Sequence, residues 1–145
     1  MANTFSVSRE AQDEFALSSQ LKYQEAKKRK SFENEIVPIK IVERKGERMV
    51  SEDEFPRADT SLDGLAKLKP CFVGAGEKGS VTAGNSSGIN DGAALVMLVK
   101  RKLAVKHNLT PLVKIVAWSQ VGNEPMLMGV APIESVKLAV SILSL

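Results

Sequence analysis

An amphipathic pattern runs through the first thirty residues of the chain. Residues that recur three or four positions apart mark one helix face: Phe15, Ala16, Ser19, Tyr23 and Ala26. Ser8 stands where an N-cap is needed, and Glu10 and Asp13 follow it near the positive end of the helix dipole. The basic run KKRK at 27–30 suits the opposite end of that dipole. The pattern predicts a helix from just after Ser8 to Lys30.

A period of two replaces the helical period at residues 35–42, EIVPIKIV. The apolar residues that fall on one side of this segment are Val37, Ile39 and Ile41. Pro38 favours a strand at the edge of a sheet, because proline cannot donate a ladder hydrogen bond. Gly46 marks a turn, and MVS at 49–51 is the candidate return strand.

A second helix is predicted after residue 60, followed by a long loop. Its apolar face consists of Leu62, Leu65, Ala66 and Leu68. Thr60 with Asp63 resembles a capping box, and Pro70 ends the helix. From Val73 to Asn90 there is no periodicity, and VGAGEKGS and GNSSGINDG are rich in turn-forming residues. An irregular loop of this length in a compact chain is typical of a functional segment or of disorder.

The last third of the chain alternates apolar runs with helical patterns. Residues 93–99 are apolar throughout, which indicates a strand covered on both faces, and PLVKIVAWSQVG at 111–122 is a second buried strand. A short helix is predicted between them, at 100–108. A final helix begins at Ile133 and should bury Val136, Val140 and Leu143. Helix and strand signals alternate, so the fold class is α/β or α+β.

Composition narrows the class of protein further. The chain has 145 residues, of which 43% are hydrophobic and 26% charged, with a net charge of +3. This length corresponds to about one domain with a real core, and the mild charge does not argue for nucleic acid. No apolar run of transmembrane length and no signal peptide are expected, so an intracellular, cytoplasmic protein without a membrane partner is the default. Both ends are abrupt, as in a piece of a larger protein.

No set of residues forms a convincing catalytic or metal site. Cys71 lies at a helix end without a visible base, and a packed thiol is the better interpretation. His107 ends a polar helix, where a solvated side chain is the better interpretation. GAGEKGS lacks the context of a phosphate cradle, and GNSSG lacks that of a nucleophile elbow. The sequence predicts no catalytic residue and no metal ligand.

Six segments, in order and in register, resemble the middle portion of thiolases, and among these the cytosolic acetoacetyl-CoA type. The segments are SREAQDEFALSSQ, EIVPIKI, DEFPRADTSLDGLAKLKPCF, SVTAGNSSGINDGAALVML, LTPLVKIVAWSQVG and EPMLMGVAPI. The phrase VTAGNSSGINDGAA is the most specific. The resemblance implies a partial thiolase fold of class α/β. Residues 1–72 would belong to a loop domain that covers coenzyme A, 73–108 to the coenzyme A-binding loop and the last strand of the first half, and 109–145 to the start of the second half.

The resemblance also implies site residues. Ser87 would hydrogen-bond the pantetheine arm of coenzyme A, although a turn-stabilising hydroxyl is the alternative. Arg57 would lie near the nucleotide end, where a fixed positive charge suits phosphate and adenine. The remaining residues that would line the tunnel or the acyl pocket are Leu65, Phe72, Ala83, Gly88 and Met128. Leu65, Phe72 and Met128 could equally be core residues, and Gly64 stands where many relatives have serine.

The activity implied by the resemblance is the reversible condensation of two acetyl-CoA molecules to acetoacetyl-CoA, with coenzyme A as substrate and no separate cofactor. The catalytic cysteines, histidine and Asn-Glu-Ala-Phe segment of the family would fall before residue 1 and beyond residue 145, so the chain is expected to be a catalytically incomplete fragment of a homo-oligomeric enzyme. The alternative is a non-catalytic protein that binds acyl-CoA or associates with thiolase subunits. RNA binding, which would rest on KKRK alone, is the weakest possibility.

Overall fold

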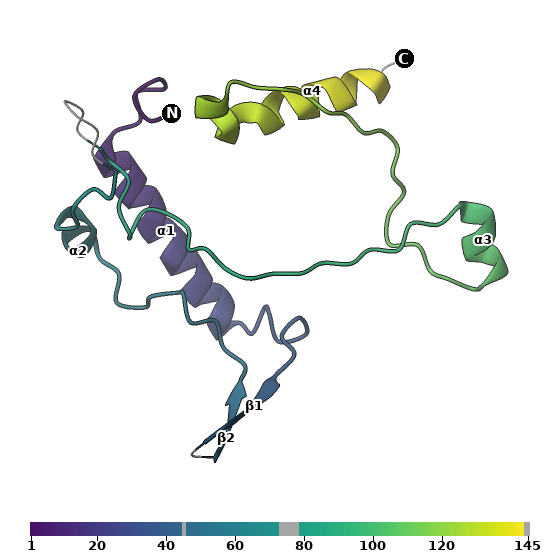
Figure 1. Ribbon diagram of the computed structural model, residues 1–145, viewed down its shortest axis with the longest axis horizontal. Helices are drawn as coiled ribbons and strands as arrows, with labels where there is room; N and C mark the ends of the chain where they lie inside the picture. Colours follow the sequence, from purple (N-terminus) through teal and green to yellow (C-terminus); the bar gives the residue numbers. More distant parts are fainter. Residues whose placement is uncertain (45, 73–78, 144–145) are drawn as a thin grey trace. The chain divides into compact units, whose positions relative to one another are not determined.

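The computed structural model describes residues 1–44, 46–72 and 79–143. Most of the predicted loop VGAGEKGS lies outside these described residues. The chain divides into two units, Ala2–Asn90 and a second one that joins Met1 to Asp91–Leu145. Figure 1 labels the elements of both units, which are described in turn.

Helix α1, Arg9–Lys28, is the longest element of the first unit. The Ser8 hydroxyl accepts a hydrogen bond from the Ala11 amide at 3.1 Å, which confirms the predicted N-cap. The helix ends slightly before the predicted Lys30, because Arg29 is the C-cap and Lys30 adopts a left-handed φ of 56°. Lys27 and Lys28 lie in the last turn, as the dipole favours.

A two-stranded antiparallel hairpin follows, formed by β1, Ile39–Glu43, and β2, Gly46–Val50. Ile39 pairs with Val50, and Gly46 adopts a φ of +136°, a conformation that favours glycine at this turn. The predicted strand at 35–42 is too early, because pairing begins only after Pro38, which cannot donate to a ladder. The predicted return strand is confirmed and is longer than expected.

Helix α2, Leu62–Ala66, packs against α1. The predicted capping box at Thr60 is wrong, since Ser61 is the N-cap and its hydroxyl accepts from the Gly64 amide at 3.2 Å. Thr60 lies one residue too early to reach that amide, and its hydroxyl instead donates to the Arg57 carbonyl at 2.9 Å. Leu65 points into the packing and is only 4% exposed.

The second unit contains α3, Arg101–Lys106, a 3-10 helix η1, Pro125–Val130, and α4, Ala131–Leu143. The two predicted helices of this region are therefore confirmed, with small shifts at their ends. The Ser119 hydroxyl donates to the Ser135 carbonyl at 2.6 Å, which ties the chain before η1 to α4.

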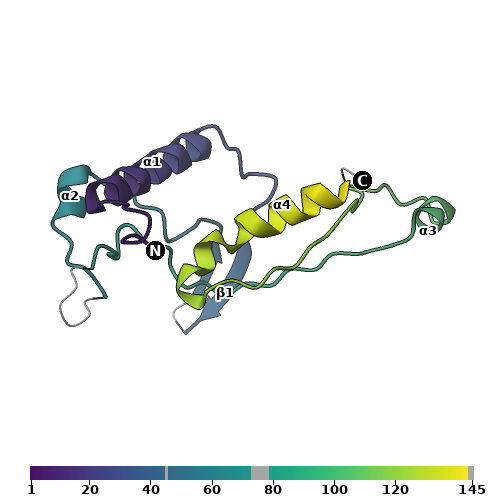
Figure 2. The same ribbon diagram turned by 90° about the horizontal axis from the view of Figure 1, so that it is seen from above.

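The predicted strands at 93–99 and 111–122, called the extended segments below, form no strand in the described part of the chain. Figure 2 shows them as bare coil on either side of α3. Leu95 is 94% exposed and Leu112 is 97% exposed, so the predicted burial is wrong for this chain. A strand requires a neighbour that supplies hydrogen-bond partners, and the pairing found among the described residues is that of β1 with β2.

Burial is low elsewhere as well. Val136, Val140 and Leu143 of α4 are each more than half exposed, which contradicts the prediction that this helix buries them. The expected real core is also wrong: the buried hydrophobic residues in the described part of the chain are Leu65 and Ala104.

The prediction that no apolar run reaches transmembrane length is also corrected. The helical stretch Pro125–Leu143 is long and apolar enough to cross a membrane by length and composition alone. A single stretch of this kind is weak support for a membrane span, because the core helix of a soluble protein passes the same test.

Candidate functional site

The segment VTAGNSSG at 81–88 forms a tight turn stabilised by its own side chains. The Thr82 side chain is fully buried. The Thr82 amide donates to Asn85 Oδ1 at 2.7 Å, and the Gly84 amide donates to Thr82 Oγ1 at 3.2 Å. Ser86 closes the turn by donating its hydroxyl to the Thr82 carbonyl at 2.7 Å. Thr82, Asn85 and Ser86 thus stabilise the turn, and the role of Ser87 stays a prediction.

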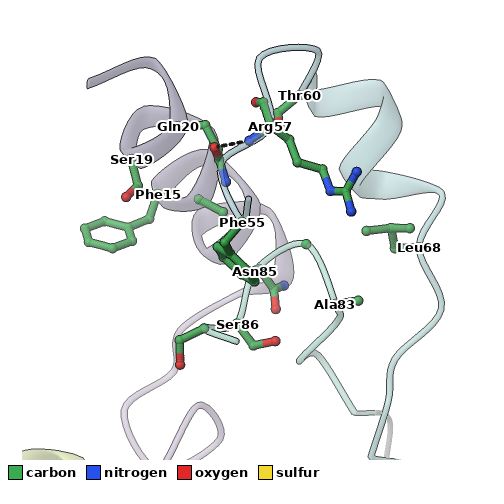
Figure 3. A pocket seen from close by; sticks show the side chains of 13 residues that line it. Phe15, Ser19, Gln20, Phe55, Arg57, Thr60, Leu68, Ala83, Asn85 and Ser86 are labelled. Carbon is green, nitrogen blue, oxygen red and sulfur yellow. Dashed lines mark hydrogen bonds between the residues drawn. The ribbon is translucent and has the colours of Figure 1, made fainter. Parts of the chain in front are cut away.

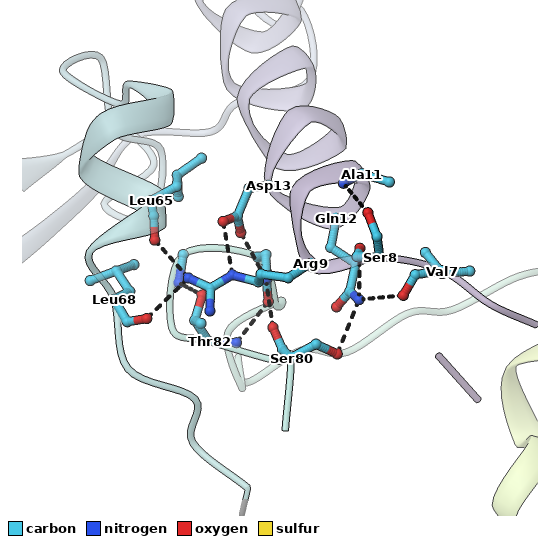
Figure 4. Close-up of polar contacts among 12 residues, drawn as sticks. Val7, Ser8, Arg9, Ala11, Gln12, Asp13, Leu65, Leu68, Ser80 and Thr82 are labelled. Atoms are coloured by element: carbon cyan, nitrogen blue, oxygen red, sulfur yellow. Dashed lines mark hydrogen bonds and ion pairs between the residues drawn. The ribbon is translucent and has the colours of Figure 1, made fainter. Parts of the chain in front are cut away.

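Helix α1 fixes this turn through Asp13, which is 4% exposed. Asn85 Nδ2 donates to Asp13 Oδ1 at 2.9 Å, and Arg9 Nε donates to Asp13 Oδ2 at 2.8 Å. Arg9 Nη2 also donates to the carbonyls of Leu65 and Leu68, at 2.7 and 3.0 Å, and so joins the C-terminal end of α2 to the same helix (Figure 4). The turn, α1 and α2 are therefore one connected packing.

Glycine is required at two positions of the turn by close approach. A Cβ on Gly84 would stand 2.5 Å from Leu65 Cδ2 and 2.6 Å from Leu68 Cδ1. A Cβ on Gly88 would stand 2.8 Å from Phe55 Cε2. All three distances are shorter than real carbon contacts, so the turn can lie this close to α2 and to Phe55 because Gly84 and Gly88 have no Cβ.

These elements surround an open pocket of about 730 Å³. It lies between α1, the segment before α2 and the turn, as Figure 3 shows. Its lining consists of Phe15, Ala16, Ser19, Gln20, Phe55, Arg57, Thr60, Leu68, Ala83, Gly84, Asn85, Ser86 and Ser87. Gln20 Oε1 accepts a hydrogen bond from the Arg57 amide at 2.9 Å, so α1 positions that residue too.

Three of the residues expected from the sequence meet at this pocket: Arg57, Ala83 and Ser87. The others lie elsewhere. Leu65 is buried beneath the turn, Phe72 is 75% exposed, and Gly88 lies behind Phe55 without reaching the lining. Met128 belongs to η1 in the second unit and is 76% exposed.

Sequence reasoning missed several lining residues. Leu68, one turn after Leu65, supplies an apolar wall, while Phe15, Gln20 and Phe55 contribute from segments that are distant in sequence. The helical period gave a usable signal for Phe15, which lies on the marked face of α1. No local signal indicated Gln20 or Phe55, because their roles depend on how α1 packs against residues 55–60.

The pocket combines one cationic residue with neutral donors and apolar walls. Among the described residues that line the pocket, Arg57 is the one that carries a charge, and Ser19, Thr60 and Ser87 supply hydroxyls. A ligand that carries an anionic group at one end and a neutral, partly apolar arm suits this arrangement. Cys71 is exposed and does not line the pocket. No group of side chains able to hold a metal ion occurs among the described residues.

Close to the pocket, charged and aromatic side chains tie α1 to the segment after β2. Tyr23 lies beside the pocket with Phe55, and its pKa is raised by partial desolvation and by its hydrogen bond to Asp53. Lys27 donates to Glu52 at 2.7 Å, which lowers the pKa of Glu52 and raises that of Lys27. These contacts hold the segment that leads to Arg57.

Comparison with known proteins identifies the family and the fold of the chain. A family model described as "Thiolase, N-terminal domain" matches residues 1–102. Cytosolic acetyl-CoA acetyltransferase of Mus musculus is 48% identical over 97% of this chain and 35% of its own length. The crystal structure of an acetyl-CoA acetyltransferase from Bacillus anthracis aligns over 99% of the chain and 36% of its own, with a TM-score of 0.86 and 40% identity. Human mitochondrial 3-ketoacyl-CoA thiolase gives the same TM-score at 37% identity.

The chain belongs to the thiolase family. It spans about a third of the length of the curated relatives that it matches. The fold class predicted from the resemblance, a partial thiolase fold with mixed helix and strand content, is confirmed. The three-part division at residues 72 and 108 stays a prediction.

Proposed function

We propose that this chain forms the coenzyme A-covering part of an acetyl-CoA acetyltransferase, which condenses two acetyl-CoA molecules reversibly to acetoacetyl-CoA. The observation that carries the proposal is the pocket in which Arg57, Ala83 and Ser87 meet. In this proposal the Ser87 hydroxyl, which has no hydrogen-bond partner among the described residues, binds an amide of the pantetheine arm. The guanidinium of Arg57 serves the nucleotide end, where phosphate charge and adenine need fixed donors.

The proposal extends to partners and location. The substrate is acetyl-CoA or another acyl-CoA, and coenzyme A needs no additional cofactor in this reaction. The complete protein is proposed to act as a homo-oligomer. Its proposed location is the cytosol, since two of the curated relatives carry the name cytosolic acetyl-CoA acetyltransferase. The catalytic cysteines and histidine would come from segments of a thiolase subunit other than these 145 residues.

The test is a chimera in which this chain replaces the matching segment of the Mus musculus cytosolic enzyme. Thiolysis of acetoacetyl-CoA, followed by loss of the enolate absorbance, measures activity, and the unmodified mouse enzyme is the positive control. We expect the chimera to turn over with a KM for coenzyme A within about tenfold of the mouse value, a difference of roughly 1.4 kcal/mol in binding. A folded chimera without activity would overturn the proposal.

A second candidate, a non-catalytic protein that associates with thiolase subunits, is favoured by the exposed extended segments. Their apolar side chains lack neighbours within the described chain, and exposed patches of this kind mark interaction sites. Co-expression of the tagged chain with an intact thiolase distinguishes the two. Stable co-purification without a gain in activity would favour the second candidate.

A further inference from the structure

We infer that Asp13 is a positioning residue for the ligand-binding turn, acting through Asn85. The inference rests on the proposed function for its consequence in coenzyme A binding, but its geometric part stands on the contacts alone. Asp13 and Asn85 are 72 residues apart and form a direct side-chain link between α1 and the turn. Neither residue was singled out by the sequence for this role.

The hydrogen bonds of Asn85 fix the orientation of its amide. Its Nδ2 donates to Asp13 Oδ1 and to the Ser80 carbonyl, at 2.9 and 3.0 Å, and its Oδ1 accepts from the Thr82 amide. Reversing the amide would place a donor against the Thr82 amide and an acceptor against two acceptors. The side chain therefore has one arrangement, and that arrangement sets the curvature of the turn.

Asp13 is in turn held on both carboxylate oxygens. One oxygen accepts from Arg9 and the other from Asn85, and the residue is 4% exposed, so water cannot easily replace either partner. A buried charge that is paired and hydrogen-bonded has a strong directional preference. The turn is consequently oriented on α1 by Asp13, in addition to the bonds that its own side chains make within it.

The position of Asp13 affects the pocket because α1 holds both the turn and the Arg57 segment, which form two of the pocket's walls. Asp13 holds the turn that presents Ala83 and Ser87, and Gln20, seven residues further along α1, accepts from the Arg57 amide. Residues seven apart lie on the same helix face. Helix α1 therefore sets the spacing between the Ser87 hydroxyl and the Arg57 segment, which is the span that one ligand must match.

An exchange of the two side chains tests the inference. In Asp13→Asn, position 13 carries an amide that must meet both the Arg9 Nε donor and the Asn85 amide. Whichever way the two amides are turned, one donor then faces another donor, at Arg9, at Asn85 or at the Thr82 amide. Asn85→Asp brings a second carboxylate against Asp13. The combined Asp13→Asn and Asn85→Asp variant restores an amide-to-carboxylate bond and keeps acceptors for Arg9 and the Thr82 amide. It gives up the Arg9–Asp13 ion pair and sets a carboxylate oxygen against the Ser80 carbonyl. Glu14→Gln, an exposed acid-to-amide change on α1, is the matched control.

The structural readout is hydrogen exchange of residues 80–90 in the full 145-residue chain. We expect each single variant to accelerate exchange of the turn amides by about tenfold, the order of cost for an unpaired buried donor. The combined variant should recover part of that protection, because it relieves the donor–donor and carboxylate–carboxylate contacts of the single variants, and the control should not change it. Equal exchange in all variants, or no recovery in the combined variant, would overturn the inference.

The functional readout is kinetics in the chimera. We expect each single variant to raise the KM for coenzyme A about tenfold with kcat nearly unchanged, and the combined variant to return it to within about threefold. A general loss of folding would lower the amount of active enzyme and reduce kcat instead. If the unaltered chimera is inactive, the proposed function fails while the exchange data still decide the role of Asp13. Altered exchange with an unchanged KM in an active chimera would overturn the link to the ligand.

Discussion

Replacing Gly84 by alanine should destabilise the packing of the turn on α2. The new methyl group would stand 2.5 Å from Leu65 Cδ2 and 2.6 Å from Leu68 Cδ1, so both leucines must move by about an ångström. Leu68 is 38% exposed and can rotate outward, but Leu65 is 4% exposed and has no free space. The cost therefore comes mainly from Leu65, and overpacking of this kind amounts to about 1–3 kcal/mol.

Hydrogen exchange of residues 61–68 and 80–90, measured by mass spectrometry, reports this local free energy. A cost of about 1–3 kcal/mol corresponds to roughly five- to hundredfold faster exchange. Gly92→Ala is the matched control, because no atom lies within 4 Å of a Cβ at that position. Adding Leu65→Ala to Gly84→Ala should cost less than the sum of the single changes, because the deleted side chain makes room for the methyl group. Equal exchange in the Gly84 and Gly92 variants would refute the packing described here.

Five further outcomes are expected. In the chimera, Ser87→Ala should weaken coenzyme A binding by about 0.5–1.5 kcal/mol in calorimetry, the value of one neutral hydrogen bond. Arg57→Ala should weaken it more at low salt than at high salt, because a charge near phosphate is screened. Protection near residues 50–54 should fall as pH drops through the lowered pKa of Glu52 and again as pH rises through the raised pKa of Lys27, and Glu52→Gln should abolish the acidic step. The isolated chain should associate in sedimentation velocity through its extended segments, whereas a sharp two-state melt of a clean monomer would count against this. The same chain should show no thiolase turnover.

Local signals in the sequence predicted the elements whose bonds are local. The Ser8 cap, the extent of α1 and the hairpin turn at Gly46 each depend on residues within a few positions, and each was correct to within a few residues. The cap of α2 was misplaced by one position because Thr60 and Ser61 are both acceptable N-cap residues. Only the geometry of the first turn distinguishes them.

The prediction of strands in the extended segments was wrong for a different reason. Their apolar composition favours a strand covered on both faces. Whether they form one depends on other segments that would pair with them and cover them. Similarly, the pocket could be anticipated at Ser87 from the family phrase but not at Gln20, because a contact between residues 20 and 57 depends on tertiary packing. The sequence therefore predicted which residues could form a sheet or a site, but it did not predict which of these residues contact one another in the folded chain.

We expect no turnover in the isolated chain because of where its reactive side chains lie. Claisen condensation needs a thiolate to hold the acyl group, a base to take the α-proton and donors for each developing oxyanion. Cys71 is exposed and does not line the pocket, and His107 caps α3 in the second unit. Ser87 can position a ligand, but positioning without a nucleophile leaves no covalent route. Thiolysis of acetoacetyl-CoA by the purified chain should remain at the background rate, with Cys71→Ala as the comparison. Turnover that disappears in Cys71→Ala would mean that this thiol is a nucleophile and that the assignment of the catalytic groups to other thiolase segments is wrong.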